Sequence, residues 1–151
     1  MSRILITGMS GAGKTTVLNE LSRRGYRTID TDYDGWVRTD GTWDEARMAA
    51  LLASDRSVVV SGTVENQDRF YDRFAAVVLL SAPVDVLLER VAARTNNPYG
   101  QAEAEQALIR HHVADVEPLL RKGATLELDS RRPLSELADE VQRLIRIPRQ
   151  T

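Results

Sequence analysis

Short apolar runs alternate along the chain with stretches in which apolar residues recur every three or four positions. The runs are rich in branched side chains and lie at residues 4–7, 27–30, 57–61, 76–80 and 124–128. Two of them, 57–61 and 76–80, are apolar on successive residues, which is typical of strands in a parallel sheet covered on both faces. The pattern therefore predicts five strands.

Helices are predicted between these strands. Apolar residues at helical spacing over 17–21, 84–91, 109–120 and 134–144 indicate four of them, and we expect a further helix over 43–53 with Thr42 as its N-cap. Pro118 is expected to distort or end the longest helix. Strands that alternate with helices predict one domain over residues 1–151, a three-layer αβα sandwich around a five-stranded parallel sheet.

Composition narrows the classes of protein that remain. The chain has 151 residues, 42% hydrophobic and 28% charged, with a net charge of -2, so no broad basic face for nucleic acid is expected. It has no cysteine, which excludes disulfides, cysteine-bound zinc and a thiol nucleophile. No apolar run approaches the roughly 20 residues of a membrane span. We expect a cytoplasmic protein without membrane contact, either a monomer or a weak homodimer.

A glycine-rich segment between the first strand and the first helix carries the strongest signal. It reads Gly-Met-Ser-Gly-Ala-Gly-Lys-Thr over residues 8–15, the phosphate-loop pattern. Its glycines let the backbone curl so that successive N–H groups point at phosphate oxygens. The positive end of the dipole of the following helix also favours the phosphates. Lys14 is expected to reach the β- and γ-phosphates, and the Thr15 hydroxyl to bind Mg²⁺. The predicted nucleotide ligands are Gly8, Ser10, Gly11, Ala12, Gly13, Lys14, Thr15 and Thr16.

Two aspartates, Asp30 and Asp32, follow the second strand. Ligands of open α/β sheets bind beyond the carboxyl ends of the strands, and side chains two residues apart on an extended segment point the same way. One carboxylate can hold the metal while the other accepts a proton from an attacking hydroxyl. The alternative is a solvated acidic turn.

The chain resembles the small P-loop kinases, namely shikimate kinase, gluconate kinase and the nucleoside monophosphate kinases. The phosphate loop, the Asp30-x-Asp32 pair and Leu87-x-x-Arg90-x-x-x-Arg94 carry this resemblance. It implies that Asp30 lies near the magnesium and that Asp32 holds the hydroxyls of the acceptor. It also implies that Arg90 and Arg94 serve the nucleotide and the transferring phosphoryl group, next to a short phosphate lid at about 95–105.

The resemblance also concerns the segment that contacts the adenine base and the segment that contacts the acceptor. The turn over 129–133 corresponds to the segment that lies against adenine in these kinases, where Arg131 can stack on the base. The alternative is a solvated turn at the start of a helix. After the third strand, shikimate kinases have a run of three glycines, whereas this chain has only Gly62. This departure disfavours shikimate itself as the acceptor.

Candidate acceptor residues lie in two segments. Glu65 and Asn66 follow the third strand and suit a polyol, a sugar or an amine; the alternative is an exposed helix start. An acceptor lid is expected over about 33–56, where Trp36 can stack on a ring and Arg38 can pair with an anion. The alternative for Trp36 and for Trp43 is packing of the lid onto the sheet.

The predicted function is transfer of the γ-phosphoryl group of MgATP to a small hydroxyl compound. The first alternative is a nucleoside monophosphate kinase. A nucleotide acceptor calls for arginines in the acceptor lid, and Arg38, Arg47 and Arg56 are candidates. A regulatory module that binds nucleotide without an acceptor is a second alternative, from another class. The guanine signature Asn-Lys-x-Asp is absent from the sequence, which argues against a GTPase switch.

Overall fold

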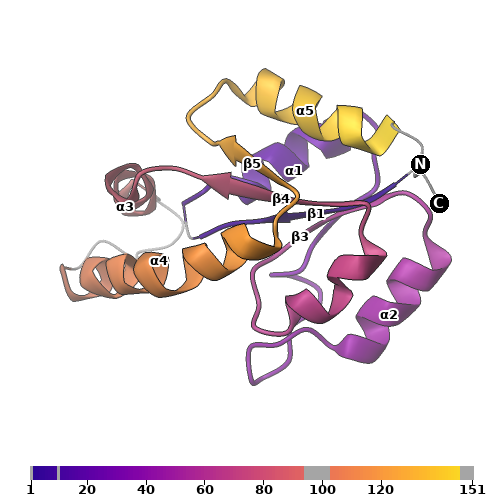
Figure 1. The fold of residues 1–151 in the computed structure, drawn as a ribbon, viewed down its shortest axis with the longest axis horizontal. Helices are drawn as coiled ribbons and strands as arrows, with labels where there is room; N and C mark the ends of the chain where they lie inside the picture. The colour runs from indigo at the N-terminus through magenta and orange to yellow at the C-terminus, as the bar shows by residue number, and fades with distance from the viewer. Residues whose placement is uncertain (1, 10, 94–102, 147–151) are drawn as a thin grey trace.

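A computed structural model describes residues 2–9, 11–93 and 103–146. Its five strands form one parallel sheet in the order β2-β3-β1-β4-β5. In chain order they are β1 (Arg3–Thr7), β2 (Thr28–Asp30), β3 (Val58–Ser61), β4 (Ala76–Ser81) and β5 (Leu126–Asp129). Figure 1 labels four of them, β3, β1, β4 and β5. The predicted parallel αβα fold is confirmed.

The helices cover both faces of the sheet. They are α1 (Lys14–Arg23), α2 (Glu45–Ser54), the 3-10 helix η1 (Gln67–Arg73), α3 (Val84–Ala92), α4 (Glu103–Gly123) and α5 (Leu134–Arg146). Helices α1 and α5 lie side by side on one face, and α2 and η1 lie on the other (Figure 1). Strand β1 therefore sends Ile4 and Ile6 into one core and Leu5 into the other, where it meets Trp43 and Met48.

Two helix boundaries differ from those expected. Helix α2 begins at Glu45, and its N-cap is Asp44, whose side chain accepts a hydrogen bond from the Arg47 amide at 3.1 Å. Thr42 does not cap it, because the Thr42 hydroxyl donates to Asp40 at 2.6 Å and so closes the preceding turn. Carboxylates and hydroxyls are both good N-caps, so composition alone did not separate the two positions.

Pro118 lies inside α4, which continues unbroken to Gly123, so the expected end of the helix at this proline is wrong. Proline removes the hydrogen bond to the carbonyl four residues earlier, that of Ala114. Both Ala114 and Pro118 are exposed, and water can satisfy that carbonyl. The cost is therefore smaller than at a buried position.

Glu20 connects the two helices of one face through Arg24. Its carboxylate accepts a hydrogen bond from Arg24 Nε at 2.9 Å, and Arg24 also reaches Asp139 on α5 at 2.7 Å. Hydrogen bonds from Arg23 and Arg24 lower the pKa of Glu20 from 4.5 to about 2. A lowered pKa in the folded state stabilises the fold above the unfolded pKa, and this stabilisation is lost as pH falls through the folded pKa.

We expect Glu20→Gln to flatten the pH dependence of stability. Between pH 4.5 and about 2 the Tm of the wild type should fall more steeply than that of the variant, because only the wild type must protonate this carboxylate. Thermal melts followed by circular dichroism across this range measure the difference. Glu89→Gln on α3 is the control, because Glu89 is exposed and is distant from this cluster in the chain. Parallel curves for the wild type and Glu20→Gln would contradict the assignment.

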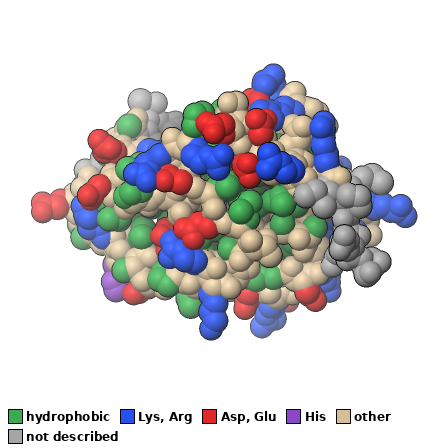
Figure 2. Space-filling view, turned by 45° about the horizontal axis from the view of Figure 1, so that its top comes forward, with side chains coloured by type: hydrophobic (Ala, Val, Ile, Leu, Met, Phe, Trp, Pro, Cys, Tyr) green, Lys and Arg blue, Asp and Glu red, His purple; other side chains and the backbone are tan. Residues whose placement is uncertain are grey.

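The surface carries both signs of charge. On the face in Figure 2, lysine and arginine side chains are interspersed with aspartate and glutamate, and no basic patch gathers there. Within the described part of the chain, no helix combines the length and the apolar content needed to cross a membrane.

Candidate phosphate and acceptor site

The loop between β1 and α1 is shaped by its glycines. Gly11 and Gly13 have φ of 84° and 92°, in the left-handed region that side chains disfavour. A Cβ at Gly11 would also collide with the Leu87 carbonyl of α3. Helix α1 begins at Lys14, directly after Gly13, so its N-terminal amides open toward the loop. Ser10 lies outside the described residues.

Three predicted residues meet at this loop, two from the start of α1 and one from the end of β2. Lys14 Nζ donates to the Gly8 carbonyl at 2.6 Å, across the opening of the loop. The Thr15 hydroxyl donates to Asp30 Oδ2 at 3.2 Å. The carboxyl end of β2 thus lies beside the start of α1, although β3 separates β2 from β1 in the sheet. A hydroxyl and a carboxylate are the hard oxygen ligands that Mg²⁺ prefers, and bound phosphates and water can supply the rest.

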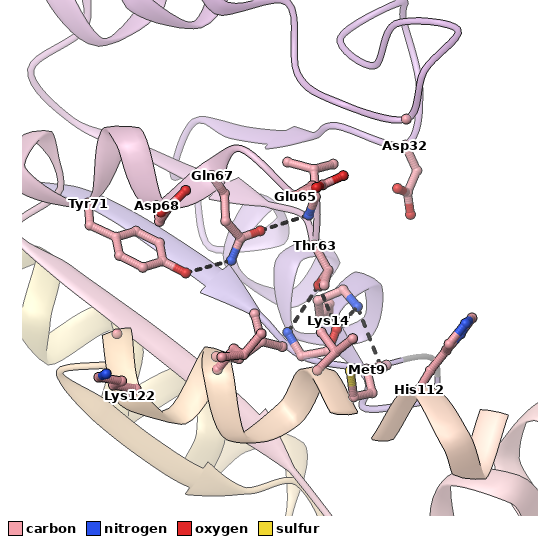
Figure 3. A pocket seen from close by; sticks show the side chains of 17 residues that line it. Met9, Lys14, Asp32, Thr63, Glu65, Gln67, Asp68, Tyr71, His112 and Lys122 are labelled. Atoms are coloured by element: carbon pink, nitrogen blue, oxygen red, sulfur yellow. Dashed lines mark hydrogen bonds between the residues drawn. The ribbon is translucent and has the colours of Figure 1, made fainter. Parts of the chain in front are cut away.

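A cavity of about 890 Å³ extends from the loop between η1 and α4. Lys14 and Asp32 both line it near the loop, and Figure 3 shows the Asp32 carboxylate directed toward it. The other side chains that line the cavity are those of Met9, Thr63, Val64, Glu65, Gln67, Asp68, Tyr71, His112, Val116, Leu119, Leu120 and Lys122. The cavity is large enough for a small molecule beside the phosphates.

Thr63 and Gln67, which the sequence did not single out, brace the phosphate loop. The Thr63 hydroxyl donates to the Gly8 carbonyl at 2.6 Å and accepts from the Gly8 amide at 3.2 Å. Gln67 Nε2 donates to the Thr7 hydroxyl at 3.1 Å, and Gln67 Oε1 accepts from the Val64 amide at 2.9 Å. The segment after β3 therefore fixes where the loop begins.

We expect Thr63→Val to weaken nucleotide binding. The substitution keeps the shape of the side chain and removes both hydrogen bonds to Gly8, at a cost of about 1–3 kcal/mol for the polar groups left unpaired. Calorimetric titration with ATP should show a Kd raised by about tenfold. Thr63→Ser keeps the hydroxyl and should bind nearly as the wild type does; equal Kd values for Val and Ser would refute the bracing role.

Some of the predicted acceptor residues are buried in the fold, and the others are exposed. The Asn66 amide is fully used, because its Oδ1 accepts from the Trp43 amide at 2.9 Å and its Nδ2 donates to the Trp43 carbonyl and to Glu45. Trp36 is only 8% exposed, and the Arg47 guanidinium lies 3.9 Å from its ring centroid. Asn66 and both tryptophans therefore hold the segment 33–56 onto the sheet.

Glu65 and Arg38 are exposed members of this group. Glu65 is exposed and lines the cavity, whereas Arg38 is exposed on a small hairpin in which Val37 pairs with Trp43. Arg38 lines an adjoining hollow, which shares Glu65 and Asp68 with the cavity. Of the predicted acceptor residues, Asp32 and Glu65 are the two that the structure places in the cavity.

Arg90, predicted to serve the nucleotide, lies against the phosphate loop. Its Nη1 donates to the Gly11 carbonyl at 3.1 Å and to the Ser130 hydroxyl at 2.8 Å, and its Nη2 donates to the Ser130 carbonyl. It thus ties the phosphate loop to the turn after β5. Arg94 lies outside the described residues, as does the lid over 95–102, and α4 already begins at Glu103.

Arg131 lies in that same turn after β5. It is exposed and forms an ion pair with Asp129 at 2.6 Å, and this hydrogen-bonded pair lowers the pKa of Asp129 from 3.8 to about 2. The guanidinium is thus held against Asp129, in the turn that Arg90 contacts through Ser130.

Known proteins resemble this chain over most of its length. Residues 4–111 match the AAA domain family. A shikimate kinase of Halorhodospira halophila is 33% identical to this chain, in a match that covers 85% of this chain and 84% of the relative. A dephospho-CoA kinase of Deinococcus radiodurans is 26% identical, in a match that covers 95% of this chain and 91% of the relative. Among solved structures, a shikimate kinase from Acinetobacter baumannii in complex with shikimate has a TM-score of 0.72 and 25% identity, covering 96% of this chain and 93% of that one.

Proposed function

We propose that this chain, which belongs to the AAA domain family and within it to the small P-loop kinases related to shikimate kinase, phosphorylates a hydroxyl group of a small molecule. Kinase activity follows from the family, so the alternative of a regulatory module without an acceptor is set aside. The observation that supports a hydroxyl acceptor is the position of Asp32, which lines the same cavity as Lys14.

In the proposed reaction the acceptor lies in the cavity with its hydroxyl against Asp32. Asp32 takes the proton as the acceptor oxygen forms a bond to the γ-phosphorus of ATP. The bond between that phosphorus and the β,γ-bridging oxygen breaks, and ADP leaves with the electron pair. Lys14 stabilises the charge on the phosphoryl oxygens during transfer.

Arg90 has a supporting part in this proposal. It donates hydrogen bonds to the Gly11 carbonyl and to the Ser130 hydroxyl, so it fixes the position of the phosphate loop relative to the turn that carries Arg131. Arg131 is the proposed contact to the base, by stacking. Arg94, whose position the structure does not describe, keeps its predicted role as a cation for the transferring group.

Magnesium fits the oxygen pair formed by Thr15 and Asp30. These two residues would hold the ion, directly or through water, because their side chains already lie within 3.2 Å of each other. When bound, Mg²⁺ neutralises charge on the β- and γ-phosphates. Asp30 is also anchored, since its Oδ1 accepts from the Asp32 amide at 3.0 Å. This contact couples the position of the proposed base to that of the metal ligand.

The cavity favours a hydroxyl compound over a nucleoside monophosphate. A phosphate acceptor calls for arginines, which bind its oxygens in pairs. Among the described residues, those that line the cavity include no arginine. Arg47 lies over Trp36, and Arg38 lines the adjoining hollow, so neither lines the cavity that holds Lys14 and Asp32.

An acceptor screen tests the proposed function. Wild type and Asp32→Asn are incubated with MgATP and a panel of polyols, sugars, amino alcohols, hydroxy acids and nucleoside monophosphates, and ADP release is measured. We expect a hydroxyl compound to raise ADP release in the wild type and to do so far less in Asp32→Asn. No increase with any member, together with equal turnover in both proteins, would remove the base from the mechanism.

A further inference from the structure

The acceptor part of the cavity is lined by carboxylates. Asp32, Glu65 and Asp68 are all exposed to it, and none of the three side chains has an ion pair or hydrogen bond to another described side chain. Figure 3 shows Glu65 and Asp68 on the η1 side and Asp32 above the phosphate loop. We infer that the acceptor is an amino alcohol, a hydroxyl compound that carries a positive charge and an apolar face. This inference rests on the proposed function.

The cations of the cavity lie elsewhere. Lys14 is at the phosphate loop, where ATP would engage it. In Figure 3, Lys122 and His112 lie toward opposite ends of the α4 segment, away from Glu65 and Asp68. Glu65 and Asp68 also line an adjoining hollow, which Arg38 and Arg69 line with them. Arg69 pairs there with Glu45 at 3.2 Å, and neither arginine lines the cavity. A carboxylate on the acceptor would therefore face like charges, whereas an ammonium group would face opposite ones.

The opposite wall of the cavity is apolar. Helix α4 presents Val116, Leu119 and Leu120 to it. The Leu119 side chain is 67% exposed, so a ligand that covered it would gain free energy from burial of its apolar surface. The Tyr71 ring adds an aromatic surface on the η1 side, with its hydroxyl hydrogen-bonded to Gln67 at 2.9 Å. An acceptor that is a bare polyol would leave this wall in water, and an acceptor with a carbon ring or chain would cover it.

Matched acceptors test the charge. On one carbon skeleton three compounds are compared that share a hydroxyl and differ in the group across the ring: trans-4-aminocyclohexanol, trans-cyclohexane-1,4-diol and trans-4-hydroxycyclohexanecarboxylate. With MgATP in excess, we expect the ammonium compound to have the highest kcat/KM, about tenfold or more above its neutral partner, and the carboxylate the lowest. A neutral or acidic acceptor that exceeds its amine partner overturns the inference.

Variants assign the preference to these residues. Glu65→Gln and Asp68→Asn, alone and together, should raise the KM of the amine toward that of the neutral compound, so that the ratio of their kcat/KM values falls toward one. Glu89→Gln on α3 is the control, because it removes an exposed charge that does not line the cavity. An amine preference that survives in the double variant overturns the role of the two carboxylates.

The two failures are distinguishable. If the charge inference is wrong, a hydroxyl compound is still phosphorylated and Asp32→Asn still abolishes the transfer, but the amine is not preferred. If the proposed function is wrong, no hydroxyl compound of any charge is phosphorylated and Asp32→Asn leaves ADP release unchanged.

Discussion

Asp32→Asn should lower kcat for the acceptor by about 10²- to 10⁴-fold, the usual contribution of a positioned general base. The amide keeps the size of the side chain and its hydrogen-bonding reach, but it cannot take the proton of the attacking hydroxyl. The KM for MgATP should change little, because Asp30, not Asp32, makes the contact to Thr15. Steady-state kinetics with ADP release coupled to a second enzyme measure both constants.

Asp34→Asn is the matched control for this result. Asp34 is two residues further along, is exposed and does not line the cavity. Its φ of 65° lies in the left-handed region, which asparagine tolerates at least as well as aspartate, so the fold should be kept. Equal losses in the two variants would show that charge near the site, and not proton transfer by Asp32, explains the effect.

Lys14→Met should lower kcat by about 10²- to 10³-fold, as removal of a preorganised group that stabilises transition-state charge does. It should also weaken ATP binding, since the Lys14 ammonium lies across the opening of the phosphate loop, 2.6 Å from the Gly8 carbonyl. Methionine fills a similar volume, so the loss reports on charge rather than on packing. Calorimetric titration and initial rates give the two quantities separately.

The chain offers a close comparison for Lys14→Met. Its sequence contains two lysines, and the second, Lys122, lines the same cavity at the end away from the phosphate loop. Lys122→Met should therefore keep ATP binding and most of kcat. A similar loss in both variants would mean that the net charge of the cavity, and not a contact to the phosphates, governs the rate.

The parts of the site that sequence reasoning reached are encoded locally. The loop at Gly8–Lys14 follows from glycine conformation and from the adjoining strand and helix, all within a few residues. The contact of Thr15 with Asp30 is longer in range, but it follows from one rule, that parallel strands bring their carboxyl ends to one edge. Alternation of apolar runs with helical spacing was likewise enough for the order of the five strands and the five α-helices, but it did not predict the 3-10 helix η1 between β3 and β4.

The parts that sequence reasoning did not reach depend on side-chain direction across the fold. Thr63 and Asn66 are three residues apart, yet one braces Gly8 and the other is folded under Trp43. No propensity separates these roles, because each depends on which way a short loop turns after β3. The partner of Arg90 was beyond sequence reasoning for the same reason, because Ser130 lies 40 residues away in the chain.

The measurement that tests the central claim most directly is transfer of label from ATP. Wild type and Asp32→Asn are incubated with γ-³²P-ATP, Mg²⁺ and the acceptor from the screen, and the products are separated. The account predicts that the wild type yields a labelled phosphomonoester of the acceptor, which alkaline phosphatase releases, and that Asp32→Asn forms it at least about a hundredfold more slowly. Label that appears only as inorganic phosphate, or that enters a nucleoside diphosphate, would contradict phosphoryl transfer to a hydroxyl at this site.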